Sequence, residues 1–242
     1  MQATRRDWER FLRKQRLLVV APHADDEVAG AGGLIARTKD AGGKVFVMVV
    51  STGDLDHFDG RRGHTHGTTR DRELAAAMRL LRVDDYEILF RNSDQHLRMD
   101  ALPRRDLVNW IERKGRLATE KTRPTMIVLP APSFNQDHEA VHQAGITACR
   151  PHLATLKSFQ RMVLVADAPQ LAWGTVRFHP NFYVEITKFL PKKLAAFRCH
   201  RSQIRPSPHQ GGVDALEYLA RMRGREISVE AAEAFECLRF VV

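Results

Sequence analysis

The sequence predicts an α/β protein of one domain, residues 1–242, with a mostly parallel sheet flanked by helices on both faces. Short apolar runs, each with the length of a strand buried on both faces, recur along the chain. Helical patterns lie between most of these runs, and this alternation is typical of a parallel sheet. The 242 residues, 43% of them apolar and 28% charged, suit one globular domain. We therefore expect a Rossmann-like fold.

The apolar runs indicate about seven strands. Six are assigned to definite stretches: residues 17–21, 44–50, 86–90, 126–130, 162–166 and 182–186. Helices are expected at residues 1–14, 29–36, 68–82, 102–120, 137–147, 191–200, 214–223 and 228–237. Thr68 or Thr69 can cap the third of these helices. Residues 54–67 form a polar loop that contains His57, His64 and His66, and both a plain surface loop and a substrate-contacting loop remain open for it.

Composition also bears on location and redox state. No apolar run approaches the roughly 20 residues of a membrane span. The first ten residues lack the apolar core of a signal peptide and contain acids, unlike a transit peptide. Cys149, Cys199 and Cys237 are far apart, which favours reduced thiols over a disulfide framework. We therefore expect a cytoplasmic protein.

The formal charge of +9 raises the question of an anionic partner. Lys and Arg are dispersed in pairs such as Arg61-Arg62 and Lys192-Lys193, without a basic run or an aromatic platform. Nucleic-acid binding is therefore disfavoured, and a solvated basic surface is the main interpretation. An anionic substrate, such as a nucleotide-linked or lipid-linked sugar, remains the alternative because a positive surface would attract its phosphates.

Acid–base and metal-binding side chains come directly after the first predicted strand, which ends at Pro22. Ligand sites in open α/β sheets form at the carboxyl ends of the strands. A catalytic zinc takes three protein ligands and keeps one position open for water. We expect His23 and Asp26 to supply two ligands. Asp25 lies next to a ligand but faces elsewhere, which suits a general base.

A second polar turn follows the strand predicted at residues 126–130. We expect His138 in this turn to be the third ligand, with Asp137 beside it orienting a histidine. His142 lies four residues further along the same helix face. Because the turn lacks a His-Glu-x-x-His pattern, a surface or supporting role is favoured for His142.

These motifs resemble the PIG-L (LmbE-like) family of zinc-dependent N-deacetylases, which hydrolyse N-acetyl groups on glucosamine-type sugars. The matching stretches are residues 22–27, the glycine-rich helix after them, 51–54, 70–83, 137–138 and 193–203. The resemblance therefore covers about residues 17–203. It implies His23, Asp26 and His138 as zinc ligands and Asp25 as the base.

The resemblance also implies where the substrate binds. Arg70 and Asp94 match positions that hold substrate hydroxyls or phosphate in this family. Asp54, which ends the turn after the second strand, is a further candidate for substrate binding.

One departure from the family pattern concerns the leaving amine. Family members often place a histidine three residues before the last ligand, where this sequence has Asn135. An amide can donate a hydrogen bond to an oxyanion but cannot deliver a proton. Either Asp25 acts as base and then as acid, or another histidine takes the second role, for which His200 is the candidate.

The sequence thus predicts a zinc-dependent hydrolase that removes an N-acetyl group from an amino sugar or sugar conjugate. The same ligands could hold Fe²⁺, Co²⁺ or Mn²⁺, and a homo-oligomer is possible. Four alternatives stay open: a capped turn without metal, a non-haem iron site formed by His23, Asp25 and His138, a sugar-binding member without activity, and an amidase or esterase with a non-sugar substrate.

Overall fold

Seven strands form the central sheet of the computed structural model, which describes residues 5–57, 63–173 and 177–242. Their order across the sheet is β5-β2-β1-β6-β7-β9-β8. Their bounds are β1 (Arg16–His23), β2 (Lys44–Ser51), β5 (Asp85–Phe90), β6 (Met126–Pro130), β7 (Met162–Ala166), β8 (Phe182–Glu185) and β9 (Ala232–Phe240). Strands β5, β2, β1, β6 and β7 are parallel to one another, while β9 runs antiparallel to both β7 and β8. The predicted mostly parallel sheet is therefore confirmed.

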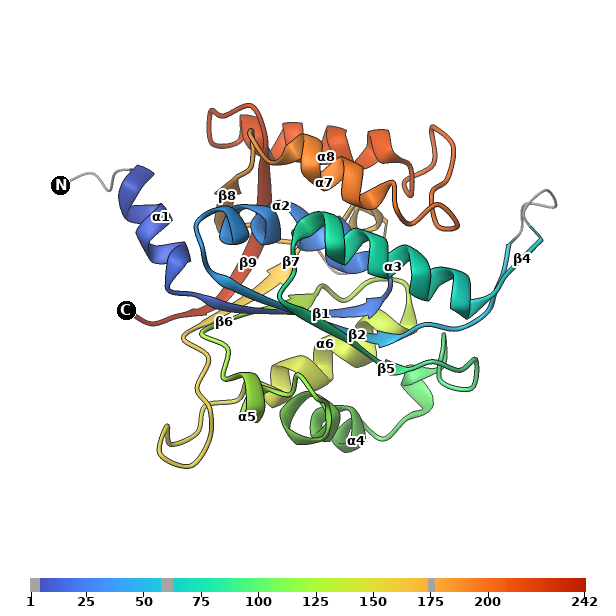
Figure 1. Ribbon diagram of the computed structural model, residues 1–242, viewed down its shortest axis with the longest axis horizontal. Helices are drawn as coiled ribbons and strands as arrows, with labels where there is room; N and C mark the ends of the chain where they lie inside the picture. The colour runs from blue at the N-terminus through green and yellow to red at the C-terminus, as the bar shows by residue number, and fades with distance from the viewer. Residues whose placement is uncertain (1–4, 58–62, 174–176) are drawn as a thin grey trace.

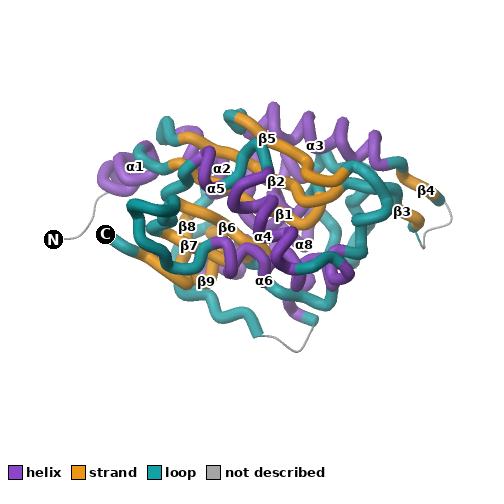
Figure 2. The backbone as a smooth tube through the Cα atoms, turned by 90° about the horizontal axis from the view of Figure 1, so that it is seen from below, coloured by secondary structure: helices purple, strands orange, loops and turns teal. Residues whose placement is uncertain are grey.

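Helices cover both faces of the sheet, as predicted (Figure 1). One face carries α2 (Asp26–Asp40), α3 (Gly67–Leu81), α7 (Leu190–Phe197) and α8 (Val213–Arg225). The other carries α4 (Arg104–Asn109), α5 (Thr119–Thr122) and α6 (Gln136–Ala148), which stand in front of the strands in Figure 2. Helix α1 (Arg5–Arg13) lies at one end, and residues 1–4 of its predicted span are outside the described residues. Single turns of 3₁₀ helix occur at Met99–Ala101 and Pro169–Ala172.

Strand β1 shows why its sequence is apolar throughout. Leu17 and Val19 pack into the core under α2 and α3, whereas Leu18 and Val20 pack into the core under α4 and α6. Alternate side chains of a strand point to opposite faces, so a strand covered on both sides has no polar position. Pro22 was expected to end this strand, but the parallel pairing with β2 resumes at His23. The extension matters because it fixes His23 on the sheet itself.

The helix predicted at residues 228–237 is wrong, because the chain forms strand β9 there. Alanine and glutamate in this segment favour a helix locally. Pairing with β7 on one side and β8 on the other overrides that preference and buries Phe235 completely. The carboxylate of Glu233 is satisfied by Lys193 and by backbone N–H groups of α2.

The helix predicted at residues 102–120 is also interrupted. It consists of α4, a π-helical turn at Trp110–Lys114 and, after a break, α5. The break occurs because the backbone N–H groups of Arg116 and Leu117 donate to the Glu87 carboxylate on β5 instead of to helical carbonyls.

A short hairpin lies within the predicted loop at residues 54–67. Strands β3 (Leu55–Asp56) and β4 (His64–Thr65) pair antiparallel and project beyond the start of α3, at the right of Figure 1. Residues 58–62, which include the pair Arg61-Arg62, lie outside the described residues. Helix α3 begins at Gly67, slightly before the predicted caps, because Asp54 accepts a hydrogen bond from the Gly67 N–H. Among the described helices, none has the length and apolar character needed to cross a membrane.

Candidate metal centre and active site

The three predicted metal ligands meet at the carboxyl edge of the sheet. His23 ends β1, Asp26 begins α2 and His138 lies in the first turn of α6. The Asp26 Oδ2 atom is 3.4 Å from His23 Nδ1 and 3.2 Å from His138 Nε2. One ligand atom from each residue lies within 4.8 Å of the other two. Residues 115 positions apart in the chain thus present two imidazoles and one carboxylate to one point, which is a donor set that could hold a divalent metal.

Asp137 orients His23, as expected from the sequence. Its Oδ2 atom is 2.8 Å from His23 Nε2, and its side chain is completely buried. The same carboxylate accepts the backbone N–H groups of Leu97 and Met99 at 2.8 and 2.9 Å. A carboxylate on Nε2 favours the tautomer with its proton there, which leaves the Nδ1 lone pair facing Asp26.

Strong electrostatic coupling links these groups. Burial alone would raise the pKa of the Asp26 carboxyl, but His138 and His23 hold it far below its ordinary value. Burial alone would lower the pKa of His23, but the carboxylates of Asp137 and Asp26 raise it to about 9. Both shifts arise from attraction between the imidazoles and the carboxylates, and metal binding must displace any proton that this attraction holds.

Asp25 lies between the two proposed ligands His23 and Asp26 in the chain, and its backbone is strained. Its backbone has a φ of 128°, a conformation that residues with a side chain rarely adopt. Its N–H donates to Glu27 Oε2 at 2.8 Å. Burial and the neighbouring Asp26 carboxylate raise the pKa of Asp25 to about 7. A carboxyl group of this kind can take up and return a proton near neutral pH.

His200 contacts Glu27 and is not part of the His23, Asp26 and His138 group. Its side chain is completely buried, and its Nε2 atom is 2.9 Å from Glu27 Oε1. Burial alone would lower the pKa of His200, but the carboxylates of Glu27 and Asp25 raise it. These contacts fit a role for His200 in supporting the Glu27–Asp25 arrangement, and proton delivery by His200 stays a prediction.

His96 is part of the site and was missed from the sequence. Its Nε2 atom is 2.6 Å from the Arg70 guanidinium, its Nδ1 atom is 2.9 Å from Ser51 Oγ, and its ring meets the His23 ring edge-on at 5.1 Å. Burial and the Arg70 charge lower the pKa of His96 to about 3, so the ring is neutral. The neutral ring accepts from Arg70, which is itself only 3% exposed, and thereby fixes its direction. The sequence feature that could have pointed to His96 was its place in the loop after a predicted strand, two residues beyond Asp94.

The remaining predicted site residues lie around this group. The side-chain Oδ1 atom of Asn135 accepts from the Asp137 N–H at 2.9 Å and so caps α6, which leaves the NH₂ of the same amide as a free donor group. Asp54 is exposed and caps α3, and Asp94 is exposed in the loop after β5. Their predicted contacts with substrate stay predictions. His142, half-buried, contacts the Pro130 carbonyl, in keeping with a supporting role.

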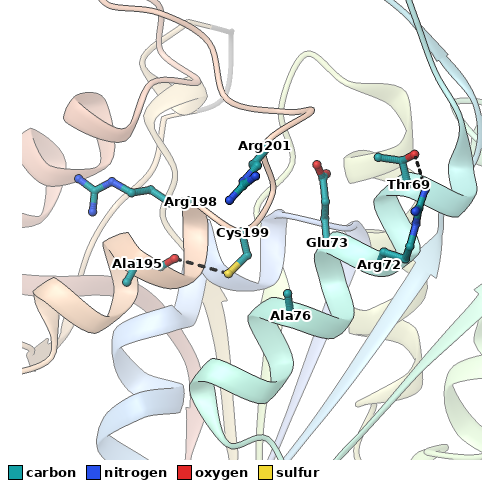
Figure 3. A pocket seen from close by; sticks show the side chains of 8 residues that line it. All are labelled: Thr69, Arg72, Glu73, Ala76, Ala195, Arg198, Cys199 and Arg201. Carbon is teal, nitrogen blue, oxygen red and sulfur yellow. Dashed lines mark hydrogen bonds between the residues drawn. The ribbon is translucent and has the colours of Figure 1, made fainter.

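A separate open pocket of about 500 Å³ lies between α3 and the end of α7 (Figure 3). Its lining includes Arg72, Arg198 and Arg201 together with Cys199. None of the residues predicted for the active site lines it. Three arginines and one acidic residue, Glu73, therefore line a pocket that contains none of the proposed metal ligands.

Comparison with known proteins adds a family assignment to this geometry. The family model described as GlcNAc-PI de-N-acetylase, PIG-L, matches residues 18–149, more than half of the chain. The chain belongs to the PIG-L family. The matched segment contains all three residues of the His23, Asp26 and His138 group, so the sequence resemblance is confirmed at the level of the family.

Individual relatives of this PIG-L chain are named as deacetylases. Diacetylchitobiose deacetylase from Thermococcus kodakarensis is 28% identical over 204 residues, which cover 81% of this chain and 72% of that protein. A probable N-acetyl-α-D-glucosaminyl L-malate deacetylase 2 from Bacillus cereus is 26% identical over 78% of this chain and 84% of its own length. Among solved structures, the conserved protein TT1542 from Thermus thermophilus superposes with a TM-score of 0.71 at 26% identity, covering 94% of this chain and 96% of its own.

Proposed function

We propose that this chain is a metal-dependent N-deacetylase that releases acetate and a free amine from an N-acetylated amino sugar or sugar conjugate. The observation that carries the proposal is the meeting of His23, Asp26 and His138 beside Asp25, in a family whose relatives are named as sugar deacetylases. The fold alone would not support this proposal, because one fold can host unrelated reactions.

The donor set fits zinc. Two imidazoles and one carboxylate leave the bound ion with a net positive charge and an open position, which is the pattern of catalytic zinc sites. The Asp137 carboxylate on His23 Nε2 is the supporting contact that metal-binding histidines usually have. His23, Asp26 and His138 would therefore hold Zn²⁺, with Fe²⁺, Co²⁺ or Mn²⁺ as other ions that such ligands accept. When bound, the ion supplies a Lewis acid that acidifies water and polarises the acetamide carbonyl.

The chain's own residues then divide the proton transfers. Asp25 takes the proton from the attacking water, because its pKa of about 7 lets the carboxylate act as a base at neutral pH. The same property lets protonated Asp25 return that proton to the leaving nitrogen. Asn135 can donate its amide N–H to the carbonyl oxygen as negative charge develops there. Arg70, fixed by His96, presents a positive charge at the same edge of the sheet for a polar or anionic part of the substrate.

An acetate-release assay on a panel of N-acetylated sugars tests this function. The panel holds free, nucleotide-linked and lipid-linked N-acetylglucosamine, with an N-acyl amine that is not a sugar and an aryl ester for comparison. We expect turnover of at least one sugar, loss of turnover after chelation and recovery after addition of Zn²⁺. Turnover of the ester or the non-sugar amide alone would replace the sugar by another substrate class. Activity that survives chelation would refute the metal-dependent mechanism.

A further inference from the structure

A second group of metal-binding side chains lies at the hairpin, apart from the proposed catalytic centre. Asp54 follows β2, His64 begins β4 and His66 directly precedes α3. The Asp54 Oδ2 atom is 3.4 Å from His64 Nε2 and 4.0 Å from His66 Nδ1. One ligand atom from each of the three residues lies within 4.8 Å of the others. We propose that Asp54, His64 and His66 form a second binding site for a divalent transition-metal ion of the Zn²⁺ or Co²⁺ kind.

Contacts around this group hold its ligand atoms in fixed directions, as in a specific metal site. The Nδ1 atom of His64 is 2.7 Å from Asp56 Oδ1, so its second nitrogen, Nε2, is the one that faces Asp54. This is the carboxylate–histidine arrangement that fixes the tautomer and ring direction of metal-binding histidines. Asp54 is fixed in turn, because its Oδ1 atom accepts the Gly67 N–H at 2.8 Å while Oδ2 faces the imidazoles.

The backbone explains why the three side chains meet. Pairing of β3 with β4 places His64 opposite Asp56, which gives His64 its supporting carboxylate. The turn between β4 and α3 then brings the His66 ring to 4.6 Å from the His64 ring. Two imidazoles and one carboxylate leave room for water at the remaining positions, since all three side chains are exposed. Imidazole donors favour transition ions over Ca²⁺ and Mg²⁺, which take oxygen ligands.

This inference does not rest on the proposed deacetylase function, because metal binding is measured directly. The metal-depleted full chain is titrated with Co²⁺, and bound metal is counted by equilibrium dialysis while the visible absorption of the ion reports nitrogen coordination. We expect two equivalents for the unmodified chain. The double substitution His64→Gln and His66→Gln should lose the equivalent at the hairpin and retain the one at the catalytic centre. His138→Ala should lose the equivalent at the catalytic centre and retain the one at the hairpin.

Two further variants distinguish a specific metal site from nonspecific binding of metal to surface histidines. Asp56→Asn removes the carboxylate that orients His64, and we expect the second equivalent to bind about 10- to 100-fold more weakly. His152→Gln replaces an exposed histidine far along the chain and should leave both equivalents unchanged. A single equivalent in the unmodified chain that the double variant retains and His138→Ala loses would overturn the proposal. Retention of two equivalents by the double variant would do the same and would assign the second ion to adventitious surface binding.

Discussion

Replacement of Glu27 tests whether the strained backbone of Asp25 is held in place by a buried carboxylate. Glu27 is completely buried and accepts from the Asp25 N–H through one oxygen, while its other oxygen meets His200. A backbone with φ of 128° at a non-glycine residue costs about 1–3 kcal/mol. A hydrogen bond to a charged group contributes about 1.5–3 kcal/mol, which is enough to offset that strain.

The two substitutions Glu27→Gln and Glu27→Met should give graded effects. Glutamine can still accept one neutral hydrogen bond from Asp25, so about 1 kcal/mol is lost and kcat should fall about fivefold. Methionine fills the space without accepting a strong hydrogen bond, so the full 1.5–3 kcal/mol is lost and kcat should fall about 10- to 150-fold. Metal content should stay at the wild-type level in both variants, because Glu27 does not touch His23, Asp26 or His138 in any described contact.

The assay combines acetate release at saturating substrate with metal analysis and a thermal melt. Glu112→Gln is the matched control, since Glu112 is a buried carboxylate, 2% exposed, that pairs with Lys157 on the opposite face of the sheet. We expect its kcat to match the unmodified chain. Equal kcat values for Glu27→Met and the unmodified chain would refute the reasoning, and so would loss of metal from either Glu27 variant.

Three further predictions concern the base, a ligand and the pH dependence of stability. Asp25→Asn should retain metal while kcat falls by about 10²–10⁴, the usual contribution of a general base, and unchanged kcat would exclude Asp25 from that role. His138→Ala should lose metal from the catalytic centre together with acetate release; metal analysis after dialysis checks this, and full retention would point to another third ligand. Asp84→Asn should lower the melting temperature at pH 7, because Lys39 and Lys44 stabilise the ionised carboxylate and lower its pKa despite partial burial. Because the pKa of Asp84 is lowered in the folded chain, this stability is present above the ordinary value of 3.8 and is lost as pH falls below it. The difference in melting temperature from the unmodified chain should therefore persist at pH 5 and shrink towards pH 3. The control Asp100→Asn, at an exposed position, should show no such difference in melting temperature.

The strands of the parallel part of the sheet could be predicted because their signal is local. A run such as residues 126–130 is apolar at every position, and the structure forms β6 over the same five residues and buries all of them. Strand β9 could not be predicted in this way. Its pairing partners, β7 and β8, lie earlier in the chain, by 47 residues for Glu185 and Ala232 and by 78 for Met162 and Phe240, and its own alanines and glutamates favour a helix until those partners are in place.

In the candidate site too, residues recognised from a local motif could be predicted, whereas residues placed by contacts distant in the chain could not. His23, Asp25 and Asp26 share one strand-to-helix turn, so their spacing could be recognised directly in the sequence. His96 has no neighbouring motif residue, and its place in the site depends on contacts with Arg70 and Ser51, which only the folded chain brings near it. The position of His200 was likewise hidden, because the sequence does not reveal that this histidine contacts Glu27, 173 residues earlier in the chain.

Asp137 explains how these separate segments form one site. Its carboxylate orients His23 from one side and accepts the N–H groups of Leu97 and Met99 from the other, so a single buried side chain joins the end of β1 to the loop after β5. That loop carries His96, which in turn fixes Arg70. A change at Asp137 would therefore disturb both the proposed metal ligands and the cationic group proposed for substrate binding. The coupling gives a physical reason why the acid beside the last ligand matters even though it is not itself part of the proposed ligand set.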